Sequence, residues 1–217
     1  MTSAHPWFVL VAGINGAGKS TFAQDPTTIR EFCGLTGRSD DIEIINPDII
    51  TRKLLQKEPH LSLNDANRRA ADLCEERVRQ LVDVATHSFV IETVLSTNKY
   101  KAVVKRAIER GFRFLFVYVV LASVEEAMGR VALRVAGGGH DVPAEKVRKR
   151  WPRSFKMMPW FWQHADLAFM FFNGSSESPI RLAERRANWV SVLQRDLGPI
   201  ELERLWPRLV RPTRNRK

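Results

Sequence analysis

The segment from residue 13 to residue 20 reads Gly-Ile-Asn-Gly-Ala-Gly-Lys-Ser, and it follows directly on the apolar run at 7–12. Glycines, a lysine and a hydroxyl residue at these offsets, after a strand of buried type, are the pattern of a phosphate-binding loop. Such a loop joins a strand to a helix whose N-terminal N–H groups carry partial positive charge. The sequence therefore predicts a strand-loop-helix unit that binds a nucleoside triphosphate.

Each polar side chain of this loop has its own expected role. Lys19 would place a full positive charge at the β- and γ-phosphates. Ser20 would offer its hydroxyl to Mg²⁺, and Thr21 is placed to reach the α-phosphate. The glycines allow bare backbone to curl round the phosphates with its N–H groups pointing at the anion. The loop residues expected to bind nucleotide are Gly13, Asn15, Gly16, Ala17, Gly18, Lys19, Ser20 and Thr21, and Ser20 is also the expected metal ligand.

Short β-branched or aromatic runs alternate with longer helical patterns along the chain. This alternation predicts an α/β fold with a mainly parallel five-stranded sheet and helical crossovers. The expected strands are 7–12, 42–45, 89–92, 112–121 and 167–173. The expected helices are 19–32, 48–56, 64–86, 97–110, 124–135 and 143–157. After residue 179 the periodicity fits a helix or a hairpin, and we favour short strands at 180–183 and 189–193.

The composition favours one compact domain. The chain has 217 residues, of which 44% are hydrophobic and 27% charged, and no compositional bias points to disorder. We expect a domain at 1–195 and a basic C-terminal tail at 196–217, and we interpret the basic stretch from Arg204 to Lys217 as a solvated, partly frayed terminus rather than an arm for nucleic acid. No apolar run is long enough to span a bilayer. Cys33 and Cys74 stand far apart with no metal-binding spacing, so we expect reduced thiols and a cytoplasmic protein.

Polar residues follow the second and third expected strands. In an open parallel sheet, ligands gather at the carboxyl ends of the strands. Asp48 comes just after the strand at 42–45, where it could act as a general base that accepts a proton from an attacking hydroxyl, or as a helix N-cap, or as both. Glu92 ends the strand at 89–92 and could bind a substrate hydroxyl or contact the metal through water. Both carboxylates are expected to face one cleft.

A basic segment between Arg130 and Arg153 supplies the second requirement of phosphoryl transfer, which is positive charge over the γ-phosphate. Arg130 and Arg134 are four residues apart on one helical face, immediately before the glycines at 137–139. Glycines beside a mobile cationic helix are typical of a lid, which we expect at about 124–157. His140, between these glycines and the next helix, is interpreted as a loop residue or hydrogen-bond partner. The net charge of +10 likewise favours anionic ligands.

Several of these segments together resemble the zeta-toxin-type P-loop kinases, specifically their branch of small bacterial ATPases. The resemblance rests on the segments 12–21, 45–48, 89–93, 130–143 and 148–150. It implies a three-layer P-loop NTPase fold of kinase type with a helical, arginine-bearing lid. It also implies that Asp48 is the catalytic aspartate and that Arg130 and Arg134 stabilise the transferring phosphoryl group together with Lys19. The substrate contacts that follow from it are Glu92, Thr93, His140 and Arg150, and the expected contact near the nucleotide base is Asn173.

The resemblance further implies a substrate class and a partner. Zeta toxins use ATP or GTP and Mg²⁺ to phosphorylate the amino-sugar part of UDP-N-acetylglucosamine, so a small anionic acceptor of this kind is expected, and an antitoxin would be a separate protein. Two alternatives stay open. One is a polynucleotide or other nucleotide kinase that uses the basic cluster to bind nucleic acid. The other is a non-catalytic switch driven by nucleoside triphosphate binding.

Overall fold

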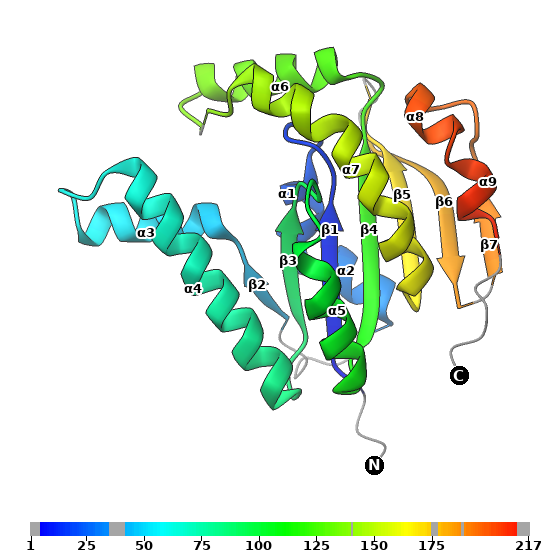
Figure 1. Ribbon diagram of the computed structural model, residues 1–217, viewed down its shortest axis with the longest axis horizontal. Coiled ribbons are helices and arrows are strands. Elements are labelled where there is room, and N and C mark those ends of the chain that lie inside the picture. Colours follow the sequence, from blue (N-terminus) through cyan, green and yellow to red (C-terminus); the bar gives the residue numbers. More distant parts are fainter. Residues whose placement is uncertain (1–4, 35–41, 140, 175–177, 188, 212–217) are drawn as a thin grey trace.

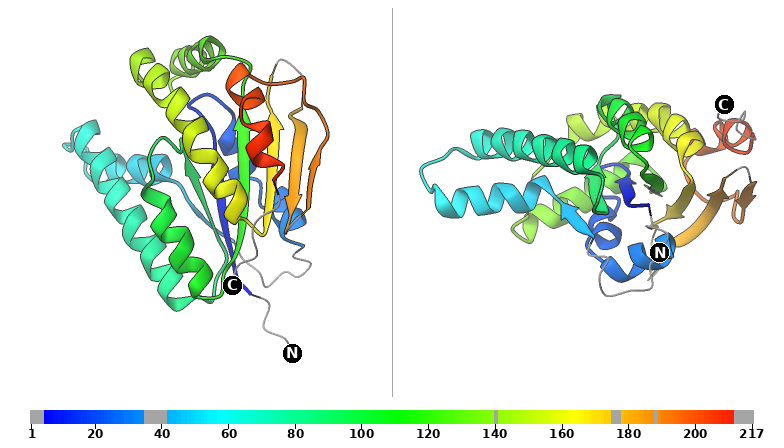
Figure 2. Two further views of the ribbon diagram at one scale, coloured as in Figure 1. Left: turned by 45° about the vertical axis from the view of Figure 1, so that its right-hand side comes forward. Right: turned by 90° about the horizontal axis from the view of Figure 1, so that it is seen from below.

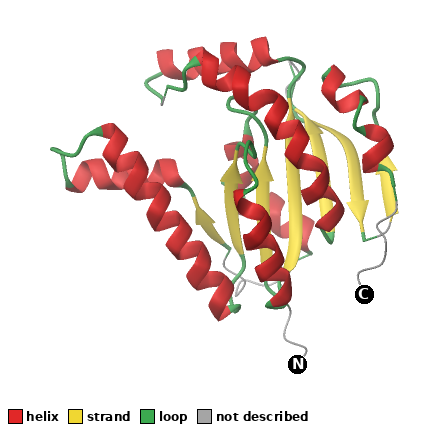
Figure 3. Cartoon of the chain, in the orientation of Figure 1, coloured by secondary structure: helices red, strands yellow, loops and turns green. Residues whose placement is uncertain are grey.

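The computed structural model describes residues 5–34, 42–139, 141–174, 178–187 and 189–211. Its core is one sheet with the strand order β2-β3-β1-β4-β5-β6-β7, shown in yellow in Figure 3 between two layers of helices. The strands are β1 (Trp7–Ala12), β2 (Glu43–Ile45), β3 (Phe89–Thr93), β4 (Arg113–Val120), β5 (Leu167–Phe172), β6 (Ile180–Arg186) and β7 (Trp189–Val192).

The first five strands of this order are all parallel, as the alternation of strands and helices predicts. β6 and β7 add an antiparallel extension beside β5. The described sheet therefore has seven strands, two more than the expected parallel set, and the two additions are the short strands favoured at 180–183 and 189–193. The three-layer α/β fold class is confirmed.

Helices connect the parallel strands, and two short helices follow the last strand. The described helices are α1 (Lys19–Ala23), α2 (Pro26–Cys33), α3 (Pro47–Lys57), α4 (Leu63–Val84), α5 (Lys99–Glu109), α6 (Val124–Ala136), α7 (Ala144–His164), α8 (Ile200–Glu203) and α9 (Trp206–Leu209). The single helix expected at 19–32 is wrong, because Asp25 caps a new helix through the N–H of Thr27 and Pro26 occupies its first turn.

Helices cover both faces of the sheet (Figure 1). On one face α5 and α7 pack on β4, where Phe161 of α7 stacks on Phe116 at a centroid distance of 5.8 Å. On the other, Phe32 of α2 stacks on Phe169 of β5 at 4.4 Å. α3 and α4 form a hairpin that projects from the body of the molecule, as both views of Figure 2 show. The described helices include none that combines the length and apolarity needed to cross a bilayer.

The segment expected to be a solvated tail is folded against the core as far as α9. Leu202, Trp206 and Leu209 are buried there, and the indole of Trp162 in α7 donates a hydrogen bond of 3.2 Å to the carbonyl of Leu209. The expectation of a frayed terminus is therefore wrong for residues 204–209, since the apolar side chains of this segment recur at helical spacing and pack on α7. The division at residue 195 itself stays a prediction.

Candidate active site

The loop at 13–18 has the backbone shape of a phosphate cradle. Gly16 and Gly18 adopt positive φ angles of 82° and 85°, which side chains rarely allow. A Cβ on Gly16 would lie 2.7 Å from the carbonyl oxygen of Ala127 in α6, and one on Gly18 would lie 2.3 Å from Nδ2 of Asn173. The loop is therefore closely covered by α6 and by the end of β5: a Cβ on Gly16 would meet backbone, and one on Gly18 would meet the end of the Asn173 side chain.

Lys19 turns back onto this loop. Its ammonium donates a hydrogen bond of 3.0 Å to the carbonyl of Ile14. The pKa of Lys19 is lowered from 10.5 to about 8, chiefly by burial; the charge of Glu92 opposes this shift, that of Arg134 adds to it, and Asp48 and Arg150 act in the same two directions with smaller effect. Two acidic and two basic side chains are therefore near enough to influence the charge of the ammonium.

The lowered pKa of Lys19 predicts a proton uptake on nucleotide binding. Above about pH 8 the free protein increasingly holds neutral Lys19, and the negative charge of a triphosphate should raise the pKa again and draw in about one proton. Calorimetry in buffers of different ionisation enthalpy should therefore show uptake above that pH and little at neutral pH. ATP affinity should fall across the same range as pH rises.

The matched control for this measurement is Lys19→Arg, whose guanidinium stays charged throughout. This variant should show no such uptake. Equal proton uptake by wild type and Lys19→Arg would contradict the assignment to Lys19.

A hydrogen-bond network joins the phosphate loop to the neighbouring strands. The Ser20 hydroxyl donates to Glu92 Oε2 at 2.9 Å, and the Asn46 amide donates to Glu92 Oε1, also at 2.9 Å. Burial raises the pKa of Glu92, and the Asp48 charge adds to this effect, while the bond from Ser20 and the charge of Lys19 oppose it. Glu92 thus lies beside the hydroxyl expected to bind metal, at the end of β3.

Asn46 is a site residue that the sequence analysis did not single out. Its side-chain oxygen accepts hydrogen bonds from the N–H groups of Asp48 at 2.8 Å and of Ile49 at 3.4 Å, so Asn46 is the N-cap of α3. The alternative that Asp48 is the N-cap is wrong, because Asp48 lies inside the first turn of the helix. An asparagine directly before a proline at the start of a helix is a capping signal that could have identified it.

A cavity of about 540 Å³ opens in front of Asp48. The side chain of Asp48 is exposed, and since Asn46 caps α3, the Asp48 carboxylate is available to a ligand. The buried Thr51 donates a hydrogen bond of 3.1 Å to Asn67 across the α3–α4 hairpin. The polar and charged residues that line the cavity are Ser20, Gln24, Asn46, Asp48, Thr51, Arg52, Asn67, Arg134 and Asp141. They come from α1 and the residue after it, from the α3–α4 hairpin, and from the end of α6 and the segment that follows it.

Arg130 points to a different place. Its guanidinium pairs with Glu126 at 2.8 Å and donates hydrogen bonds of 2.7 Å to the carbonyls of both Asn173 and Gly174. Glu126 and Ser123 also cap the start of α6. Arg130 thereby fastens α6 to the end of β5, beside the loop, whereas Arg134 one turn later lines the cavity.

The other expected contacts have clear positions. Arg150 donates a hydrogen bond of 3.1 Å to the Asn15 side chain, which sets it at the phosphate loop. The Asn173 amide donates to the carbonyl of Ala17 at 2.9 Å and supports the same loop. The Thr93 hydroxyl accepts from the N–H of Leu95 at 3.1 Å and shapes the turn after β3. Thr21 is exposed in the first helical turn after the loop, and His140 lies outside the described residues.

The expected lid divides into two parts with different surroundings. α6 and the first turns of α7 carry the arginines near the loop. The rest of α7, including Trp151, Phe155, Phe161 and Trp162, is buried against the sheet. Within the segment expected at 124–157, one face of α7 from Val147 to Phe155 thus belongs to the core, because its apolar residues recur at helical spacing, and the function of the segment as a lid stays a prediction.

Solved structures of similar fold come from several sources. The complex AvrRxo1-ORF1:AvrRxo1-ORF2 with sulphate ions contains a chain that matches 99% of this protein with a TM-score of 0.67 and 16% identity, and the match covers 66% of that chain. The PezAT chromosomal toxin-antitoxin system of Streptococcus pneumoniae matches 83% of this chain and 72% of its own, with a TM-score of 0.51 and 16% identity. A putative kinase from Chloroflexus aurantiacus matches 68% of this chain and 80% of its own, with a TM-score of 0.51 and 14% identity.

Two comparisons of sequence agree with the fold. An uncharacterized protein of Haemophilus influenzae is 30% identical over 144 residues, which are 66% of this chain and 91% of that protein. The family model AAA_33, described as an AAA domain, matches residues 8–156 and thus spans the loop, both carboxylates and the arginines of α6 and α7. The chain therefore belongs to the AAA_33 family and has a P-loop kinase-like fold.

Proposed function

We propose that this protein is a Mg²⁺-dependent kinase of zeta-toxin type that transfers the γ-phosphoryl group of ATP or GTP to a hydroxyl of a small anionic acceptor. The observation that carries the proposal is the continuous network from Ser20 through Glu92 to Asn46, which caps α3 beside Asp48. It connects a phosphate cradle to a carboxylate that lines an open cavity. This is the arrangement that a donor phosphate and an acceptor hydroxyl require.

The residues of the loop fit a nucleotide and its metal ion. The glycines at 13, 16 and 18 carry no side chain that could cover the loop, and all three have positive φ angles, so the N–H groups of the loop can approach phosphate oxygens closely. Ser20 is exposed, and its hydroxyl lies next to the Glu92 carboxylate. The hydroxyl would be a direct ligand of the metal ion, and the carboxylate would accept hydrogen bonds from water bound to that ion. Mg²⁺ in such a site neutralises charge that develops on the phosphates. A solved complex of AvrRxo1-ORF1 with ATP, of similar fold, is consistent with this donor.

In the proposed reaction Asp48 acts as general base. Its carboxylate accepts the proton of the acceptor hydroxyl as the new oxygen–phosphorus bond forms, while the bond from the γ-phosphorus to the β-phosphate oxygen breaks. Lys19, Arg134 and Arg150 neutralise the charge on the phosphates: Arg150 bonds to Asn15 of the loop, Arg134 lines the adjoining cavity, and both act on the charge of Lys19. Arg130 and Asn173 hold α6 and the loop in place, and they would border the nucleoside.

The acceptor we propose is a nucleotide sugar such as UDP-N-acetylglucosamine. The cavity offers amides and a hydroxyl that suit a sugar, together with Arg52 and Arg134 that suit an anionic group. Glu92, Thr93, Arg150 and His140 stay proposed substrate contacts on the basis of the resemblance. The same resemblance, and the likeness to a toxin-antitoxin structure, support a cytoplasmic enzyme that is held in check by a separate antitoxin protein.

A metabolite experiment tests this function. Purified protein is incubated with ATP, Mg²⁺ and a small-molecule bacterial extract, and mass spectrometry should detect a compound that gains the mass of one phosphoryl group. With pure UDP-N-acetylglucosamine, the new phosphate should appear on the amino sugar. The control reaction contains Lys19→Met, which removes the phosphate-binding charge.

Two outcomes would contradict the proposal. One is nucleotide binding with no phosphorylated product from any extract fraction, which would favour a switch. The other is a product found only with oligonucleotides, together with a steep loss of oligonucleotide binding as salt increases, which would favour the nucleic-acid kinase.

A further inference from the structure

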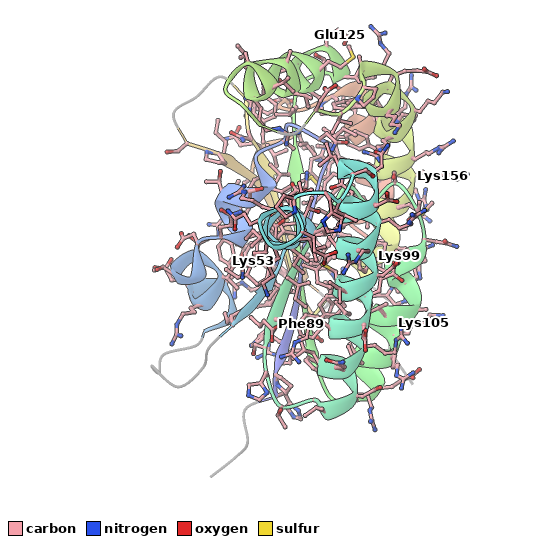
Figure 4. All side chains as sticks on the ribbon, turned by 90° about the vertical axis from the view of Figure 1, so that its left-hand side faces the viewer. Lys53, Phe89, Lys99, Lys105, Glu125 and Lys156 are labelled. Carbon is pink, nitrogen blue, oxygen red and sulfur yellow. The ribbon has the colours of Figure 1, made fainter. Side chains whose placement is uncertain are left out.

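A second cavity lies directly behind the turn that carries Asp48. Its volume is about 300 Å³, and it opens between α4 and α5. Figure 4 looks onto this side of the molecule, with α4 in front of the sheet and Lys99 and Lys105 labelled along its flank. Residues 46–48 separate the two cavities, since Pro47 lines this one while Asn46 and Asp48 line the candidate active site. The second cavity is thus distinct from the space proposed for the acceptor.

The interior of the second cavity is apolar. Side chains from β2, β3, α4 and α5 meet there, and the apolar ones are Ile45, Cys74, Val78, Val82, Ile91 and Val103. Burial raises the pKa of the Cys74 thiol to about 11, so this side chain is neutral near pH 7 and adds to the apolar wall. A hydrocarbon or aromatic group of a ligand would be favoured here by loss of contact with water.

The mouth of the cavity carries excess positive charge. Lys99 is paired there with Glu75, and Arg106 is paired with Asp83 at 2.6 Å. Arg79 also lines the mouth and is exposed. No hydrogen bond or ion pair connects Arg79 to any residue in the described part of the chain. Its guanidinium is therefore available to an anionic group on a molecule whose apolar part lies inside.

We propose that this cavity is a binding site for a small anionic amphiphile, with a hydrocarbon or aromatic body inside and a carboxylate, sulfonate or phosphate at Arg79. Its position makes it a regulatory site. Two residues of its wall, Pro47 and Ile91, immediately precede Asp48 and Glu92. A ligand that presses on them should shift the two carboxylates of the active site. This regulatory step rests on the proposed function of those carboxylates, whereas the binding site does not.

Binding is tested with octanoate and with 1-octanol, which share an apolar chain but differ in charge. Calorimetry should show saturable binding of both to the wild-type protein. Arg79→Gln should weaken octanoate binding about three- to tenfold and leave octanol unchanged, as loss of one charged contact at an exposed site predicts. Lys105→Gln is the matched control, because Lys105 is an exposed cation of the same helix pair that does not line the cavity.

A second variant tests the cavity itself without disturbing the core. Ala102 is exposed at the cavity wall, so Ala102→Trp should cover the opening while the protein keeps its thermal unfolding temperature. Binding of both probes should then be lost. Failure of octanoate to saturate the wild type, unaltered binding in Ala102→Trp, or equal loss in Arg79→Gln and Lys105→Gln would overturn the proposed site.

The regulatory step has a readout that needs no acceptor. In nuclear magnetic resonance spectra, octanoate should move the backbone amide signals of Asp48 and Glu92 in wild type and leave them unmoved in Ala102→Trp. Shifts restricted to residues of α4 and α5 would reject coupling and keep the binding site. Because neither measurement uses catalysis, failure of the kinase assay and failure of this site are distinguishable.

Discussion

Replacing Asp48 by asparagine is expected to lower the rate of phosphoryl transfer by about 10²–10⁴-fold, the usual contribution of a positioned general base. The substitution keeps the shape of the side chain and removes its capacity to accept a proton. Asn46 would still cap α3 through the N–H groups of Asp48 and Ile49, so the helix should keep its place. The loss should appear in kcat, with the affinity for ATP changed less than threefold.

The measurement is single-turnover transfer to the acceptor identified by mass spectrometry, together with calorimetric ATP titration. Asp72→Asn is the control, because Asp72 is exposed on α4 and lines neither cavity. Asp141→Asn tests a rival carboxylate, since Asp141 lines the same cavity as Asp48. Normal transfer by Asp48→Asn with loss in Asp141→Asn would assign the base to Asp141 instead.

The sequence is most informative where function depends on consecutive residues. The phosphate loop is one continuous segment with fixed offsets, so its position between β1 and α1 could be predicted directly. The parallel sheet could be predicted because each strand is a separate apolar run. Because ligands gather at the carboxyl ends of strands, Asp48 and Glu92 could be predicted to lie at one edge of the sheet. In the structure the charges of both carboxylates raise the pKa of Lys19.

Asn46 shows where such prediction ends. Its oxygen caps a helix, which is a local contact, but its amide bonds to Glu92, which is 46 residues away in the chain. Nothing in either segment alone specifies that contact, because it depends on the register of β2 against β3. The cavity between α4 and α5 is also a product of packing between distant segments and has no signature in the sequence.

The two arginines of α6 illustrate a different limit. Helical spacing predicts that Arg130 and Arg134 share a face, and it cannot predict how far that face extends across the site. Arg130 lies over the end of β5 and bonds backbone carbonyls, whereas Arg134 reaches the cavity one turn later. One turn of helix, about 5.4 Å, thus separates the backbone contacts of Arg130 from the cavity that Arg134 lines, and a catalytic role of either arginine stays a prediction.

Replacing Gly16 by alanine is expected to weaken ATP binding by about 5- to 140-fold. The new Cβ would lie 2.7 Å from the carbonyl oxygen of Ala127 and 3.3 Å from Cβ of Arg130, and backbone atoms cannot yield as a flexible side chain can. Overpacking of this kind costs about 1–3 kcal/mol, and 1.4 kcal/mol corresponds to a tenfold change in affinity. Calorimetric ATP titration measures the change.

Gly34→Ala separates this clash from the cost of backbone conformation. Gly34 also has a positive φ, of 67°, but a Cβ there would meet no atom within 4 Å. The Gly34→Ala variant should lose some thermal stability and bind ATP normally.

In the Gly16→Ala variant we expect the loop to move rather than α6, because the capping contacts of Ser123 and Glu126 and the hydrogen bonds of Arg130 hold the helix. If α6 moved instead, ATP affinity would be retained and transfer would be lost, since Arg134 would leave the cavity. The loss of ATP affinity in Gly16→Ala, compared with its loss of transfer rate, therefore measures how firmly α6 is fixed over the phosphate loop.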